Sequence, residues 1–205
     1  MQPPRFSAYE YLTFVLPGFV VLSVSVYGWH GWPYGEPGAS SLLGILIASF
    51  IVGHALSGLS NWVEPLAWWR RPGTKVSSSQ GLFGKAGLYD EKEESTIKAA
   101  FSKHYSDVSQ FESQFRLAYS EALTSPIGPR LQTLVDQIGF YRSMMVASVF
   151  SAIIVLVTET RTNENLESFF WSPFFLLLGL TFGYRYRRFW VRLGDYVVRH
   201  TLLKE

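Results

Sequence analysis

The sequence predicts an all-α integral membrane protein with four transmembrane helices, arranged as two hairpins on either side of a helical cytoplasmic insert. Three observations predict this class: long stretches without charged residues, charges sorted between the connecting loops, and apolar residues at helical spacing elsewhere. Of the 205 residues, 48% are hydrophobic and only 17% are charged, whereas an ordinary soluble domain carries about 25% charged residues. No alternating apolar and polar pattern indicates a strand.

Four uncharged stretches predict the spans. Residues 11–35 and 37–63 give 25 and 27 positions without Asp, Glu, Lys or Arg, and residues 143–158 and 168–184 give 16 and 17. About 20 apolar residues cross a ~30 Å hydrocarbon core as a helix, so the first two stretches are long enough. The last two need neighbouring uncharged residues and snorkelling arginines, and two buried helices of a soluble domain are the alternative for this pair. We expect spans at about 11–29, 41–62, 139–158 and 168–185.

The charges predict the orientation of these spans. With a cytoplasmic N-terminus the outer loops are about 31–39 and 159–167, and of the 18 basic residues only Arg161 lies in them. The outer loops then carry a net charge of −3 and the remaining segments +5. Because basic residues collect in cytoplasmic loops, we expect both termini in the cytoplasm. The lack of targeting and glycosylation signals favours a bacterial inner membrane.

These spans divide the chain into four segments. They are a first hairpin at 1–64, a cytoplasmic helical insert at 65–138, a second hairpin at 139–187 and a basic amphipathic cytoplasmic tail at 188–205.

Helix signals organise the insert. Asp90 and Glu93 have the spacing of a capping box, and the helix that they begin should end near Tyr105. Asp107 is a second candidate N-cap, and the helix after it should stop at Ser125-Pro126. A third apolar face continues into the third span without a breaker, which predicts one long helix. Its apolar residues are Leu131, Leu134, Val135 and Ile138.

The second helix of the insert offers a docking face. Phe111, Phe115 and Tyr119 recur at spacings of four residues and lie on one side of the helix. We expect this face to dock a partner, either a cytoplasmic protein or a sister membrane protein.

A polar stripe follows the cytoplasmic half of the second span. His54, Ser57, Asn61 and Glu64 are separated by three, four and three residues, so they share one helix face. Polar residues inside a membrane are costly and mark functional sites by default, so the stripe predicts a hydrated path or a proton or ion site. Hydrogen bonding to another helix is the alternative.

Small residues and a proline predict how the spans pack. Gly44 with Ala48, and Gly179 with Gly183, are small-residue pairs four positions apart that permit close helix approach, within the chain or between copies. Pro17-Gly18 predicts a kink in the first span, which serves either packing or a hinge.

Arginines follow the fourth span. Arg185, Arg187, Arg188 and Arg192 either form a solvated helix face or hold anionic lipid headgroups, since each surface arginine contributes about 1 kcal/mol toward an anionic bilayer. Nucleic acid is a poor candidate partner because the bilayer would compete for the same charges.

No catalytic or metal-binding pattern stands out. Cysteine is absent, and no nucleophile motif, zinc-protease motif or paired-aspartate metal motif occurs. We therefore expect no catalytic, cofactor or metal site, and a lipid-acting enzyme with His54 as the base is a minor alternative.

The layout of two hairpins around an insert resembles the small multi-pass membrane effectors of bacterial anti-phage defence systems. The expected function is a homo-oligomer that perturbs or permeates the membrane, controlled through the insert by a protein or small-molecule trigger. Several copies are required because four helices from one chain do not enclose a hydrated pore. The alternative is a membrane anchor or accessory subunit that docks a soluble or membrane partner through the insert.

Overall fold

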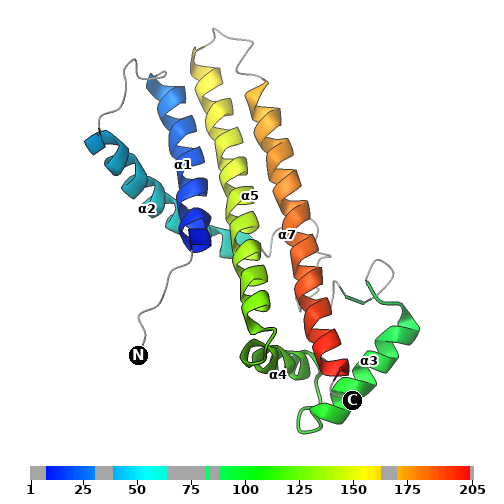
Figure 1. Cartoon of the computed structure of the whole chain (residues 1–205). Coiled ribbons are helices and arrows are strands. Elements are labelled where there is room, and N and C mark those ends of the chain that lie inside the picture. Colours follow the sequence, from blue (N-terminus) through cyan, green and yellow to red (C-terminus); the bar gives the residue numbers. More distant parts are fainter. Residues whose placement is uncertain (1–7, 31–38, 64–81, 84–87, 163–169, 204–205) are drawn as a thin grey trace. The chain divides into compact units, whose positions relative to one another are not determined.

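The computed structural model describes residues 8–30, 39–63, 82–83, 88–162 and 170–203, and nearly all of them are helical (Figure 1). In chain order the helices are α1 Ala8–His30, α2 Ala39–Val63, α3 Glu91–His104, α4 Phe111–Thr124, α5 Gly128–Thr162 and α7 Trp171–Leu202. In these ranges an isolated bridge between Phe83 and Tyr89 is the extent of β pairing. The predicted all-α class is confirmed.

Two of the described helices are long and apolar enough to cross a membrane, whereas the sequence predicts four spans. The qualifying stretches are Ser41–Asn61 of α2 and Gly128–Thr158 of α5. The apolar stretch of α1, Leu12–Val26, is shorter, and α7 reaches Arg185 after fourteen residues. Two apolar helices suggest membrane association. The outer-loop residues 31–38 and 163–167, on which the orientation depends, lie outside the described residues.

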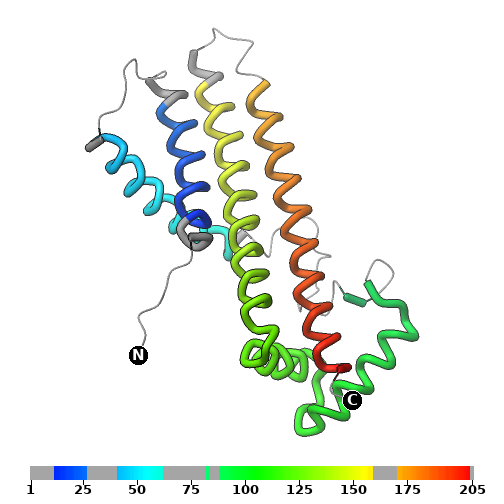
Figure 2. The backbone as a smooth tube through the Cα atoms, viewed as in Figure 1, coloured from blue at the N-terminus to red at the C-terminus, as the bar shows by residue number. Residues whose placement is uncertain are grey.

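The chain forms two compact units. The first unit contains Met1–Ala67 and Gly139–Arg185, and the second contains Trp68–Ile138 and Tyr186–Glu205. The predicted division of the chain separates the insert from the tail, but both belong to the second unit. The tail also continues α7 without a break, as the uninterrupted tube in Figure 2 shows.

The helices of the second unit begin and end at recognisable signals. Asp90 is the N-cap of α3, its carboxylate accepts from the Glu93 amide, and Glu93 accepts from the Asp90 amide, so the capping box is confirmed. The predicted N-cap at Asp107 is wrong, because α4 begins after Gln110. The buried Gln114 amide donates to the Val108 carbonyl at 2.6 Å and thereby holds the preceding segment outside the helix.

One long helix connects the end of the insert to the predicted third span. α5 runs from Gly128 to Thr162 without interruption, which confirms the prediction. Gly128 is required at its start, because a Cβ there would lie 2.1 Å from the Leu123 carbonyl oxygen. Pro129 occupies the first turn, where its missing N–H leaves no helix bond unmade.

An aromatic core holds the second unit together. Phe101 is fully buried and stacks on Phe115 at 6.1 Å between ring centroids, and it lies 5.1 Å from Phe111. Phe115 is only 4% exposed and Tyr119 is half-buried. The predicted docking face of Phe111, Phe115 and Tyr119 is thus largely interior, because α3 covers the apolar stripe of α4.

Candidate membrane-embedded site

The contact between α1 and α2 is a close crossing built on two glycines. A Cβ on Gly18 would lie 1.8 Å from the Ser49 carbonyl oxygen, and a Cβ on Gly53 would lie 1.7 Å from the Phe14 carbonyl oxygen. The two backbones touch, so neither position accepts a side chain without moving the helices apart. In Figure 1, α2 crosses α1 obliquely, as such a contact requires.

The predicted small-residue pair of this hairpin lies away from the crossing, and the predicted kink residue lies beside it. Gly44 has nothing within 4 Å of a Cβ and Ala48 is half-buried, so Gly44 makes no close helix contact within the chain. The close approach lies one to two turns further along, at Ser49 and Gly53. Pro17 is buried beside this crossing and α1 continues as a helix through it.

The polar stripe of α2 begins at this crossing. The His54 ring lies against Phe14 at 3.9 Å between centroids and against Phe50 at 4.5 Å, yet the residue remains exposed. Ser57 is half-buried and Asn61 is exposed. Neither His54 nor Asn61 forms a hydrogen bond to another described residue. Glu64, the fourth predicted member, lies outside the described residues.

The stripe continues toward the start of α2 as an apolar row. Spacings of four, three, four, three and four residues place six side chains along one seam: Leu43, Ile47, Phe50, His54, Ser57 and Asn61. This is the heptad spacing of helices that pack against other helices. The spacing of this row can be read from the sequence, but only the packing of α1 against α2 shows which of its side chains stay exposed.

The contact between α5 and α7 uses small residues as well. A Cβ on Gly179 would be in ordinary contact with Ser148 and Val149 at 3.5 Å, and Gly183 is buried. The Ser172 hydroxyl donates to the Ala152 carbonyl at 3.3 Å. The predicted Gly179 and Gly183 pair therefore lies on a buried face of α7, with Gly179 opposite Ser148.

The first unit buries many hydroxyls and exposes many large aliphatic side chains. Seven hydroxyl residues are buried there: Thr13, Ser49, Ser60, Ser143, Ser148, Ser151 and Ser172. Eight leucine and isoleucine side chains are at least half exposed: Leu43, Leu46, Ile47, Ile51, Ile153, Leu156, Leu177 and Leu180. In the described part of the second unit Leu88, Leu117 and Leu203 are the large apolar residues classed as exposed.

The predicted headgroup arginines lie on α7. Arg185, Arg187, Arg188 and Arg192 are all exposed, and the Arg192 guanidinium lies 5.5 Å from the centroid of the Phe189 ring. None of the four forms an ion pair with another described residue. Arg199, further along the helix, instead donates to Asp195 at 2.8 Å.

Leu82 and Tyr89 both contact residues near the end of α7. Leu82 is fully buried, and a Cβ on Gly194 would lie 2.7 Å from one of its methyl groups. The Tyr89 hydroxyl donates to Asp195 at 2.5 Å. Burial and the Asp195 carboxylate together raise the pKa of Tyr89, which keeps this phenol protonated.

The described residues offer no group of three His, Asp or Glu side chains that would hold a metal ion. Comparison of the chain with protein-family models, curated proteins and solved structures finds no match.

Proposed function

We propose that the chain is a four-span integral membrane protein whose copies assemble through α2 and, once assembled, perturb or permeate the bilayer. The observation that carries this proposal is the exposed seam on α2, defined above from Leu43 to Asn61. The second unit is then the cytoplasmic part that controls assembly, and both termini lie in the cytoplasm.

The burial pattern supports a lipid environment for the first unit. A core helix of a soluble protein is mostly buried, whereas only 17% of the apolar stretch of α2 is buried within the chain. Two hydroxyls in the unit bond to their own helix: Ser148 donates to the Met144 carbonyl at 2.8 Å and the exposed Thr181 to the Leu177 carbonyl at 2.9 Å. Such bonding satisfies a polar group where no water is present.

The seam supports assembly of several copies. In a bilayer the exposed His54 and Asn61 lack the water that would satisfy them, and a facing helix supplies hydrogen-bond partners instead. Each such bond contributes on the order of 0.6 kcal/mol between membrane helices. A second copy brings the same imidazole and amide, each of which both donates and accepts, so the seam is complementary to itself.

The first test is the mass of the full chain in nanodiscs, measured by native mass spectrometry. We expect four or more copies, because one copy encloses no hydrated path. A monomer or a plain dimer contradicts an intrinsic pore and favours the anchor function.

The second test joins assembly to permeation. In vesicles loaded with a fluorescent dye, the wild type should release the dye, and the double variant His54→Ala/Asn61→Leu should release little and have a smaller mass. Thr181→Val is the matched control, since it removes an exposed hydroxyl that already bonds to its own helix. Equal release from the double variant and the wild type removes the seam from the mechanism.

A further inference from the structure

One face of α7 changes character at a single turn. Phe174, Leu177 and Thr181 follow one another at three and four residues and are exposed, and Tyr184 ends this apolar row at 67% exposed. The same face continues with Arg185, Arg188 and Arg192, all exposed. Apolar side chains are stable in the hydrocarbon, and guanidinium groups in water or among phosphates. The turn at Tyr184 and Arg185 therefore has the composition of a membrane boundary.

We infer that Arg185, Arg188 and Arg192 form a binding site for the phosphate groups of anionic phospholipids. This inference rests on the proposed function in one respect: it requires that α7 cross the bilayer. The headgroup layer is about 5–8 Å thick on each side. At 1.5 Å per residue, Arg188 lies about 4.5 Å beyond Arg185 and Arg192 about 10 Å beyond it, within reach of a long side chain.

The arginines are available for such ligands. None of these three arginines is paired with a carboxylate among the described residues, whereas Arg199, about 21 Å along the helix from Arg185, bonds to Asp195. Arg192 is partly held in place by its contact with Phe189, which reduces the entropy lost on binding. Guanidinium groups bind phosphate oxygens through two parallel hydrogen bonds, so arginine suits this ligand better than lysine.

The experiment is native mass spectrometry of the full chain released from nanodiscs that contain equal amounts of phosphatidylglycerol and phosphatidylcholine. The wild type should retain phosphatidylglycerol preferentially. The triple variant R185Q/R188Q/R192Q should lose this preference by about five-fold for each arginine removed. The variant R185K/R188K/R192K keeps the charge and should keep most of the preference.

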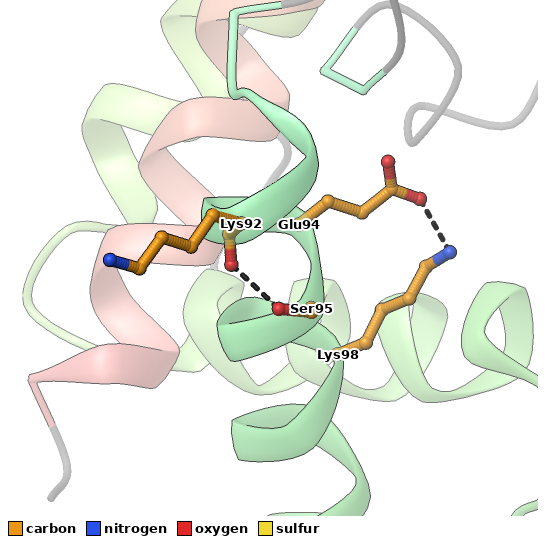
Figure 3. Close-up of polar contacts among 4 residues, drawn as sticks. All are labelled: Lys92, Glu94, Ser95 and Lys98. Carbon is orange, nitrogen blue, oxygen red and sulfur yellow. Dashed lines mark hydrogen bonds and ion pairs between the residues drawn. The ribbon is translucent and has the colours of Figure 1, made fainter.

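A charge-matched control separates a site from net charge. The variant K92Q/K103Q/R116Q removes three positive charges from α3 and α4. Lys92 is exposed and forms no ion pair among the described residues, while neighbouring Lys98 pairs with Glu94 at 2.5 Å and Ser95 donates to the Lys92 carbonyl (Figure 3). The control should retain phosphatidylglycerol as the wild type does. Equal losses in the two triple variants overturn the site.

Two further outcomes overturn the inference in distinguishable ways. If the wild type integrates into nanodiscs but retains both lipids equally, the lipid site fails and the proposed function stands. If a 20-nucleotide single strand binds the detergent-solubilised protein and displaces phosphatidylglycerol from it, the arginines serve nucleic acid instead. A chain that retains phosphatidylglycerol as a monomer contradicts the proposed oligomer and leaves the lipid site in place.

Discussion

At the scale of single residues, the first unit depends on two positions where no side chain fits. Gly18 and Gly53 lie where α1 and α2 touch, and each places its missing Cβ on a carbonyl oxygen of the other helix. Gly58 is also in α2 but has nothing within 4 Å of a Cβ. Gly53 and Gly58 of α2 thus form a matched pair, one at a backbone contact and one in open space.

Gly53→Ala should destabilise the protein and Gly58→Ala should not. The added methyl at Gly53 meets rigid backbone, and overpacking of this kind typically costs about 1–3 kcal/mol. At Gly58 the methyl meets nothing, and alanine stabilises a helix relative to glycine by about 0.5–1 kcal/mol. Thermal unfolding of both variants in the same detergent, followed by circular dichroism, measures the difference. Equal melting temperatures would show that the crossing is looser than the geometry requires.

At the scale of elements, the cap of α3 and the continuity of α5 were predictable and the tertiary contacts were not. Asp90 with Glu93 predicted the start of α3, and the absence of a breaker after Leu131 predicted the continuous α5. The start of α4 was missed because a side chain within that helix, Gln114, bonds the segment before it. Periodicity shows that Phe115 lies on an apolar face, but only the fold shows that Phe101 covers it.

The same limit applies to the candidate site. The spacing of His54, Ser57 and Asn61 predicted a stripe, but not that His54 lies between Phe14 and Phe50. Gly53 was not predicted as a packing residue, because the small residue four positions before it is Ser49 rather than glycine or alanine. The two positions matter because the backbone of α1 touches both. A search for small residues four positions apart that includes serine would have found this pair, as well as the serines of α5.

A phenol joins α4 to the end of α3. The Tyr105 hydroxyl donates to Glu121 at 2.8 Å, and burial followed by this bond raises the pKa of Tyr105 to about 12. The folded state thus holds the proton more tightly than the unfolded chain, whose tyrosine pKa is about 10. The stabilisation is complete below pH 10 and is lost as the pH rises from 10 through 12.

The melting temperature of the wild type should therefore fall between pH 10 and pH 11.5. Tyr105→Phe should have a shallower fall, because phenylalanine has no proton to lose. The melting temperature of that variant should still fall slightly with pH, because the pKa values of Tyr89 and Tyr119 are raised as well. Glu121→Gln, which removes the charge that opposes ionisation, should be intermediate. A slope unchanged by either substitution would contradict the role of this bond.

At the scale of the whole molecule, the two units have opposite surfaces. The described part of the first unit exposes leucine, isoleucine and phenylalanine and buries serine, and the second buries phenylalanine and exposes charge. A chain of this kind is stable when the first unit lies in lipid and the second in water. The apolar faces on α5 and α7 resemble that on α2, so the same environment suits all three helices.

Reporter fusions at the connecting segments test on which side of the membrane each segment lies. With four spans and cytoplasmic termini, alkaline phosphatase joined at Glu36 or Asn163 should be active outside the cytoplasmic membrane, and green fluorescent protein joined at Ser78 should fluoresce inside. Asn163 is the decisive position, because α7 is the helix whose apolar part is shortest. The fourteen residues of α7 before Arg185 span about 21 Å, which is less than a ~30 Å hydrocarbon core. Snorkelling of Arg185 and local thinning of the bilayer make up the difference. A cytoplasmic Asn163 with an external Glu36 would mean that α5 and α7 are not a membrane hairpin. Leu156 and Leu177 would then need cover from another protein, and the anchor function would replace the assembled pore.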